Sequence, residues 1–147
     1  MADREYIVSV MKRLHERPPE DAFRRFNDDN AGINCMLKYL GEVGRPVSAG
    51  EISGFMHVST ARVSVLLRKM SERNFIIREN SSKDARRLMI SLSEQGRAEG
   101  LKRREEMVDI FGRIIDRIGR ERMEEFISIT DDIKTVMKEE MEKLIKD

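Results

Sequence analysis

The sequence predicts a mainly α-helical protein with a minor β component (α+β minor). Apolar residues recur at helical spacing over most of the chain, and only one segment alternates with the period of a strand. Charged residues make up 37% of the 147 residues and apolar residues 39%. This composition is typical of long helices with solvated outer faces, and the length is that of one domain.

An amphipathic helix is expected near the N-terminus, over residues 3–16. Ile7, Met11 and Leu14 share one face of it. Pro18-Pro19 should end this helix, because proline lacks an N–H and disfavours a helical residue before it.

Two further helices are marked by their N-terminal caps. Asp28-Asp29-Asn30 offers capping side chains to a helix over residues 31–42. Ser48 and Glu51 have the spacing of a capping box, which predicts a short helix after Ser48. A tight turn then leads to Ser59, a good N-cap for an amphipathic helix that ends near Arg73. Its inward stripe consists of Val63, Leu66, Leu67 and Met70.

A β-hairpin is predicted next. Residues 75–79 are rich in β-forming types, residues 80–84 have turn chemistry, and Leu88, Ile90 and Leu92 alternate with Met89 and Ser91. The order helix, short helix, tight turn, helix and hairpin is that of a winged helix-turn-helix.

Long helices are expected after Ser93, with a break at Gly119. Their apolar stripes are too long to be buried on one small domain, so a partner surface is expected. We therefore predict a helical dimerisation lobe (residues 1–30 and 94–147) and a winged DNA-binding lobe (residues 31–93) in one continuous structural unit. The residues expected at the dimer contact are Ile7, Met11, Leu14, Phe126, Ile133, Met137, Met141 and Leu144.

Basic residues gather in the predicted helix and hairpin. Residues 59–87 contain eight basic and three acidic side chains, a local charge of +5, whereas the whole chain has a net charge of +1. Such a patch is typical of phosphate binding, although an ordinary solvated surface would also explain it. Small and basic residues occupy the outward side of the helix, which would enter the major groove. The candidates are Ser59, Thr60, Ala61, Arg62, Ser64, Val65, Arg68 and Lys69.

The hairpin tip carries Lys83, Arg86 and Arg87, which could enter an adjacent minor groove. Asp84, two residues before Arg86, could orient its guanidinium through a charge-assisted hydrogen bond.

The segment Asp84-Ala85-Arg86-Arg87-Leu88-Met89-Ile90-Ser91-Leu92-Ser93-Glu94-Gln95-Gly96 resembles the wing signature of the MarR family of transcription regulators. The resemblance implies a homodimer on a pseudo-palindromic operator, with Arg86 in the minor groove and Asp84 as its orienting partner. It also implies modulation by a small-molecule effector, such as a small aromatic or phenolic compound or an oxidant. Ala61, Val65 and Asn74 depart from the residues common in the family, so the operator sequence does not carry over.

The sequence contains little that indicates catalysis or metal binding. The sequence has no phosphate-binding loop, nucleophile elbow or paired acids, and its His and Cys residues lack ligand spacing. We therefore expect no enzyme, no catalytic residue, no metal site and no cofactor apart from an effector. Cys35 is either a peroxide sensor or, as its neighbours Met36 and Leu37 favour, an inert core residue.

The expected location is the cytoplasm. A single cysteine suits a reducing compartment, charges stand where a signal peptide would be apolar, and no apolar run approaches the ~20 residues that span a bilayer. One alternative function stays open: a winged-helix module that binds protein without specific DNA binding. The large helical tail and the departures at Ala61 and Val65 motivate it.

Overall fold

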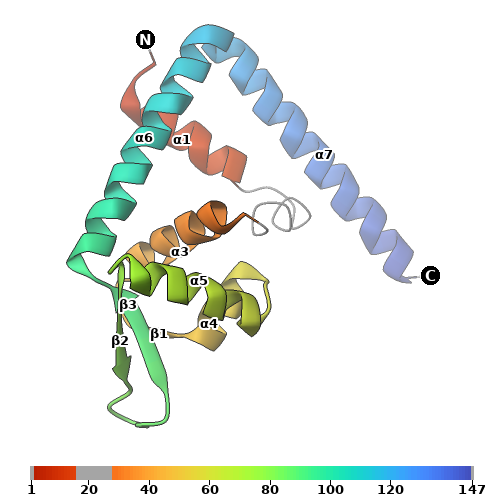
Figure 1. Ribbon diagram of the computed structural model, residues 1–147. Coiled ribbons are helices and arrows are strands. Elements are labelled where there is room, and N and C mark those ends of the chain that lie inside the picture. Colours follow the sequence, from red (N-terminus) through yellow and green to blue (C-terminus); the bar gives the residue numbers. More distant parts are fainter. Residues whose placement is uncertain (1, 16–27, 147) are drawn as a thin grey trace. The chain divides into compact units, whose positions relative to one another are not determined.

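The computed structural model describes residues 2–15 and 28–146. Their order confirms the predicted mainly helical, winged helix-turn-helix architecture (Figure 1). The elements are α1 (Arg4–His15), α3 (Asp29–Val43), β1 (Val47–Ser48), α4 (Ala49–Met56), α5 (Thr60–Glu72), β2 (Ile76–Asn80), β3 (Leu88–Leu92), α6 (Glu94–Ile118) and α7 (Arg120–Lys146). The predicted stop at Pro18-Pro19 lies outside the described residues.

The chain forms two compact units. The helical unit holds the described parts of Met1–Pro18 and Glu105–Asp147, and the winged unit holds those of Pro19–Arg104. The sequence analysis predicted the division at residue 93. In the structure the winged unit extends to Arg104 and therefore also contains the first turns of α6. The roles assigned to the two lobes stay predictions.

The core of the winged unit is formed by apolar side chains from the inward faces of its helices and its sheet. All four apolar residues of the predicted α5 stripe are buried, as are Ile33, Met36, Leu37 and Leu40 of α3. The remaining members are Val47, Ile52, Met56, Phe75, Ile76, Ile90 and Leu92. Burial of these side chains is the main term that stabilises the unit.

Local capping fixes where the helices begin and end. Asp28 caps α3, and Gly44 ends it in a left-handed conformation with φ of 62°. Ser48 and Glu51 form the predicted capping box at α4: each side chain accepts a backbone N–H from the other residue. These contacts satisfy amide groups that a helix end would otherwise leave without partners.

The sheet is antiparallel with the order β1-β3-β2. β2 and β3 form the predicted hairpin, in which Ile76 pairs with Leu92 and Asn80 with Leu88. β1 was not predicted, because two residues, Val47 and Ser48, are too few to show a period.

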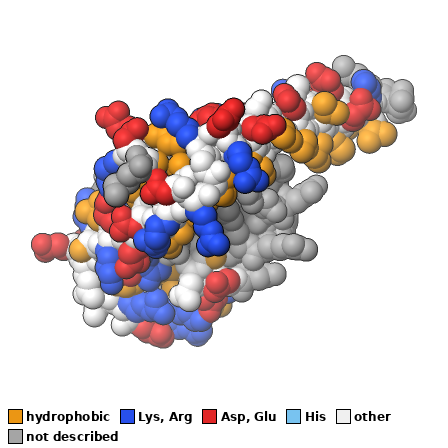
Figure 2. All heavy atoms as spheres, turned by 90° about the horizontal axis from the view of Figure 1, so that it is seen from above, with side chains coloured by type: hydrophobic (Ala, Val, Ile, Leu, Met, Phe, Trp, Pro, Cys, Tyr) orange, Lys and Arg blue, Asp and Glu red, His pale blue; other side chains and the backbone are white. Residues whose placement is uncertain are grey.

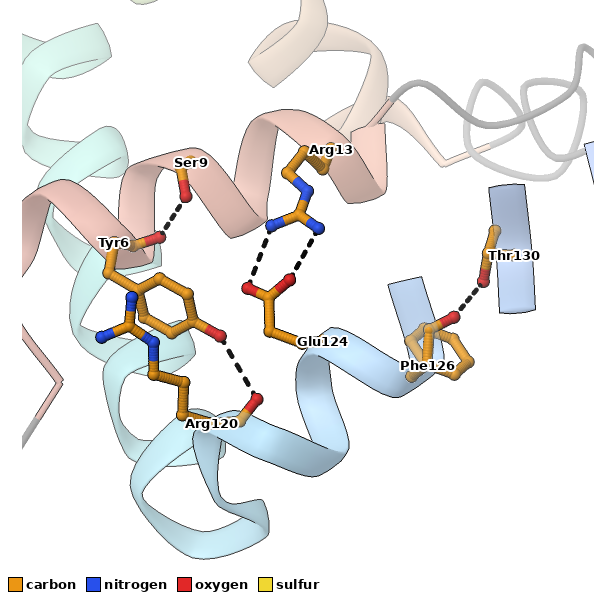
Figure 3. Close-up of polar contacts among 7 residues, drawn as sticks. All are labelled: Tyr6, Ser9, Arg13, Arg120, Glu124, Phe126 and Thr130. Carbon is orange, nitrogen blue, oxygen red and sulfur yellow. Dashed lines mark hydrogen bonds and ion pairs between the residues drawn. The ribbon is translucent and has the colours of Figure 1, made fainter. Parts of the chain in front are cut away.

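The helical unit has a core of its own. Gly119, with φ of 92°, separates α6 from α7 as predicted. Figure 3 shows that Arg13 of α1 donates two hydrogen bonds to Glu124 of α7, of 3.0 and 2.7 Å. The core residues are Tyr6, Ile7, Val10, Val108, Ile115, Met123 and Ile127. Of the helices that the structure describes, none combines the length and apolar composition that crossing a bilayer requires.

Candidate nucleic-acid interface

Helix α5 begins from a tight turn that its neighbours hold in place. His57 adopts a left-handed conformation, with φ of 53°, and the Ser53 hydroxyl donates to the Val58 carbonyl at 2.6 Å. The Ser59 hydroxyl then accepts the N–H of Arg62 at 3.1 Å, as an N-cap does. The turn and the cap set the direction in which the outward face of α5 points.

The outward face of α5 consists of small side chains and one exposed cation. Thr60, Ala61, Ser64 and Arg68 are exposed and Val65 is half-buried, whereas the opposite stripe is buried in the core. The Ser64 hydroxyl donates to the Thr60 carbonyl at 3.0 Å, which leaves its lone pairs to accept a hydrogen bond. A helix of this kind lets base edges approach closely, because no large side chain stands in the way.

Two cations that the sequence assigned to this interface have a partner inside the protein. Arg62 Nη1 lies 2.6 Å from Oδ1 of Asp29, and Lys69 Nζ contacts Oδ2 of the same carboxylate. Arg62 and Lys69 therefore lie on the side of α5 that faces the start of α3. Whether they contact DNA stays a prediction, but their ion pairs were not foreseen.

The hairpin tip is a wing built by hydrogen bonds within the loop. Ser81 N–H donates to the Arg87 carbonyl at 2.7 Å, and Arg87 N–H donates to the Asp84 carbonyl at 3.0 Å. Lys83 N–H donates to the Ser81 hydroxyl at 3.2 Å. The loop has a defined backbone shape, while Lys83, Arg86 and Arg87 extend exposed side chains from it.

Asp84 acts on Arg86 differently from the sequence prediction. Its Oδ1 accepts the backbone N–H of Arg86 at 3.0 Å. The sequence suggested a bond to the guanidinium. In the structure the carboxylate stabilises the turn that carries Arg86, and the Arg86 side chain is exposed.

The wing is attached directly to α5. Asn74 follows the helix in a left-handed conformation, with φ of 59°, as the sequence predicted for a C-terminal cap. Arg78 Nε of β2 donates to the Ser71 hydroxyl of α5 at 3.1 Å. This bond and the shared core join α5 to the base of the hairpin within the winged unit.

The residues predicted at the dimer contact fall into two groups. Ile7 is buried in the core of its own chain, Met11 is partly buried there, and the side chain of Leu14 lies outside the described residues. The α7 residues are exposed: Phe126 49%, Ile133 54%, Met137 44%, Met141 56% and Leu144 72%. Figure 2 shows hydrophobic side chains gathered along the C-terminal part of α7.

Asp29 is the contact residue that sequence reasoning missed. The segment Asp28-Asp29-Asn30 was interpreted only as capping chemistry, and Asp28 indeed accepts the N–H of Asn30 at 3.0 Å. The partners of Asp29 lie 33 and 40 positions further along the chain, so no local pattern could reveal them. Cys35 is partly buried and packs against the winged core, in line with the core interpretation.

Comparisons with known proteins agree with this geometry. Residues 35–87 match the model of the MarR family. No curated protein matches the chain. The solved structures described next share the fold with this chain. Because their sequence identities are below 25%, they are evidence of a common fold and not of a common function.

The first is MepR, described as a transcription regulator of the Staphylococcus aureus multidrug efflux pump MepA, with a TM-score of 0.62, 17% identity and coverage of 72% of this chain and 78% of that one. The second is YusO from Bacillus subtilis, with a TM-score of 0.62, 17% identity and coverage of 91% and 99%. A ZitR mutant from Lactococcus lactis has a TM-score of 0.51, 18% identity and coverage of 76% and 83%. Over residues 35–87, which contain the recognition helix and most of the wing, the chain is therefore similar to the MarR family, and its fold is shared with these solved structures.

Proposed function

We propose that this chain is a sequence-specific double-stranded DNA-binding transcription regulator that acts as a homodimer on a pseudo-palindromic operator. One observation carries the proposal. A capped helix with a small outward face and a wing with three exposed cations belong to the same compact unit. Such a helix fits the major groove of DNA, and such a wing can reach the adjacent minor groove.

Each element has a separate role in this mechanism. Arg68 can bond a guanine edge, while Ala61 and Val65 can contact thymine methyl groups. Arg86 and Arg87 would enter the minor groove, where a narrow groove concentrates negative potential. Ser59 and Thr60, at the N-terminus of α5, would bond phosphate, which positions the helix without reading sequence.

Dimerisation would place two such units on one operator. The exposed apolar residues of α7 are a surface that a second copy can cover. With twofold symmetry, the half-sites would lie about one helical turn, ~10 base pairs, apart. A small aromatic or phenolic effector would modulate binding if its affinity differed between two arrangements of the dimer.

Selection of bound fragments from random and genomic DNA tests the proposal. Competition gel shifts should then give a complex that resists non-specific competitor, with log K falling by about 0.9 per phosphate contact for each unit of log salt. Repeating the selection with phenolic and oxidant compounds tests the effector. The absence of a competitor-resistant, salt-sensitive complex would contradict the proposal and favour the protein-binding alternative.

A further inference from the structure

We propose that Asp29 limits how strongly the protein binds DNA phosphates, because its carboxylate holds Arg62 and Lys69 away from them. The inference rests on the proposed function, since it concerns how α5 binds DNA. Its consequence is a lower affinity for DNA of any sequence and a weaker dependence of binding on salt.

The geometry joins three charges from two helices. Asp29 stands in the first turn of α3, where a carboxylate is favoured by the helix dipole. Arg62 and Lys69 lie two turns apart on α5, and each contacts a different oxygen of Asp29. One carboxylate thus restrains cations over half the length of the helix.

These cations are less accessible than the others of the candidate interface. The side chain of Arg62 is 24% exposed and that of Lys69 36% exposed, whereas Arg68 is exposed on the outward face of α5. Charge-assisted hydrogen bonds are strong, and partial burial reduces the screening by salt. Asp29 therefore competes with phosphate for both side chains.

The competition affects the sequence-independent part of binding. Arg62 lies in the first turn of α5, the end of such a helix that contacts DNA. If Asp29 released it, Arg62 could reach a phosphate, and each additional phosphate bound would steepen the slope of log K against log salt by about 0.9. Bonds to phosphate carry no sequence information, so they would raise the affinity for operator and random DNA alike.

The test is Asp29→Asn, measured by fluorescence anisotropy on a random duplex and on a selected operator between about 50 and 200 mM salt. We expect tighter binding to both duplexes, by a similar factor, and a slope steeper by about one to two. Glu42→Gln is the matched control, because it removes the same charge from the exposed far end of α3. An effect of equal size in both variants would show a general charge effect and overturn the inference.

A second set of variants separates release of the cations from damage to the fold. Arg62→Gln combined with Lys69→Gln should leave the salt slope of the wild-type chain unchanged. Added to Asp29→Asn, the same pair should return the slope to the wild-type value. A slope that falls in the Arg62→Gln/Lys69→Gln variant would mean that these residues already contact phosphate, and would overturn the inference whether or not Asp29→Asn folds.

Failure of the proposed function and failure of the role of Asp29 are distinguishable. If the wild-type chain binds no duplex, the proposed function fails. If the wild-type chain binds and Asp29→Asn has the same or a weaker affinity for the random duplex, only the role of Asp29 fails.

Discussion

The carbonyl oxygen of Phe75 lies where a side chain on Gly96 would have to be. A β-carbon built on Gly96 would stand 2.0 Å from that oxygen and 2.8 Å from the carbonyl carbon. Ser93 links the same two segments, because its hydroxyl accepts the N–H of Gly96 at 2.9 Å and donates to the Asn74 carbonyl at 2.5 Å. The glycine of the wing signature thus allows α6 to start against the strand that leads into the wing.

Gly96→Ala should destabilise the protein by about 3 kcal/mol, because backbone atoms must move to make room. Gly100→Ala in the same helix is the control. Its β-carbon would meet Leu37 at an ordinary 3.8 Å, so it should stabilise by about 0.5–1 kcal/mol. Urea unfolding followed by circular dichroism gives both values. Equal stability of the two variants would contradict the close approach.

Arg86→Ala should weaken operator binding by about 1–3 kcal/mol without changing the oligomeric state. The loss should be greatest on operators with A·T-rich flanks, because their narrow minor groove attracts a guanidinium most. Gel shifts and light scattering measure the two properties. Arg122→Ala removes the same charge from the exposed surface of α7 and should bind as the wild type does. An unchanged affinity for Arg86→Ala would remove this residue from the contact.

Val65→Asp should abolish specific binding, a loss of at least a hundredfold or about 3 kcal/mol, because a carboxylate on the outward face would meet the acceptor-rich groove. Val65 is only half-buried, so the aspartate can remain hydrated in the free protein. Val65→Ala keeps the face small and should retain most of the affinity. If Val65→Asp still protects the operator from nuclease, α5 does not present this face to DNA.

What the sequence predicted correctly is local. The stripe from Val63 to Met70 follows from helical period alone, and Ser48, Ser59 and Asn74 cap through neighbours within a few positions. The period also failed where tertiary position decided the outcome. Leu88 alternates in register with Ile90 yet is 41% exposed, because it lies at the wing end of β3, beyond the core.

The members of the candidate interface stay a prediction, and the sequence did not reveal the ion pairs that two of them form. Helical spacing correctly predicted that Arg62 and Lys69 flank the outward face of α5. Their contact with Asp29 depends on how α3 packs on α5, which a charge count along the chain does not contain. In the same way, Ile7 has the spacing of a surface stripe, but α1 buries it against the helical unit's own core.

Glu124 should make the helical unit more sensitive to acid. The hydrogen bonds from Arg13 lower the pKa of this carboxyl below its ordinary value. A lowered folded-state pKa adds stability above the unfolded value, and this is lost as pH falls through the folded value. The two side chains are 41% and 39% exposed, so Glu124→Gln should cost only about 0.5–1 kcal/mol at neutral pH.

The pH dependence identifies the cause. Unfolding free energies of Glu124→Gln and wild type should converge as pH falls through the lowered folded-state pKa, because the wild-type carboxyl is then protonated in the folded protein as well. Glu125→Gln, which removes the adjacent exposed charge, is the control. A difference between Glu124→Gln and wild type that stays constant from neutral to acid pH would rule out the ion pair as its origin.

Met137→Glu should separate the proposed dimer, because the apolar row on α7 would have to bury a charge. Such burial costs several kcal/mol, and about 3 kcal/mol already raises the dissociation constant about a hundredfold. Thr135→Glu adds the same charge to an exposed position outside the row and should leave the dimer intact. Light scattering over a dilution series measures both, and thermal unfolding shows whether the separated chains remain folded, which obligate dimers often do not. A wild-type chain that is monomeric at all concentrations would refute the homodimer, whereas a Met137→Glu chain that dimerises like Thr135→Glu would move the contact away from this row.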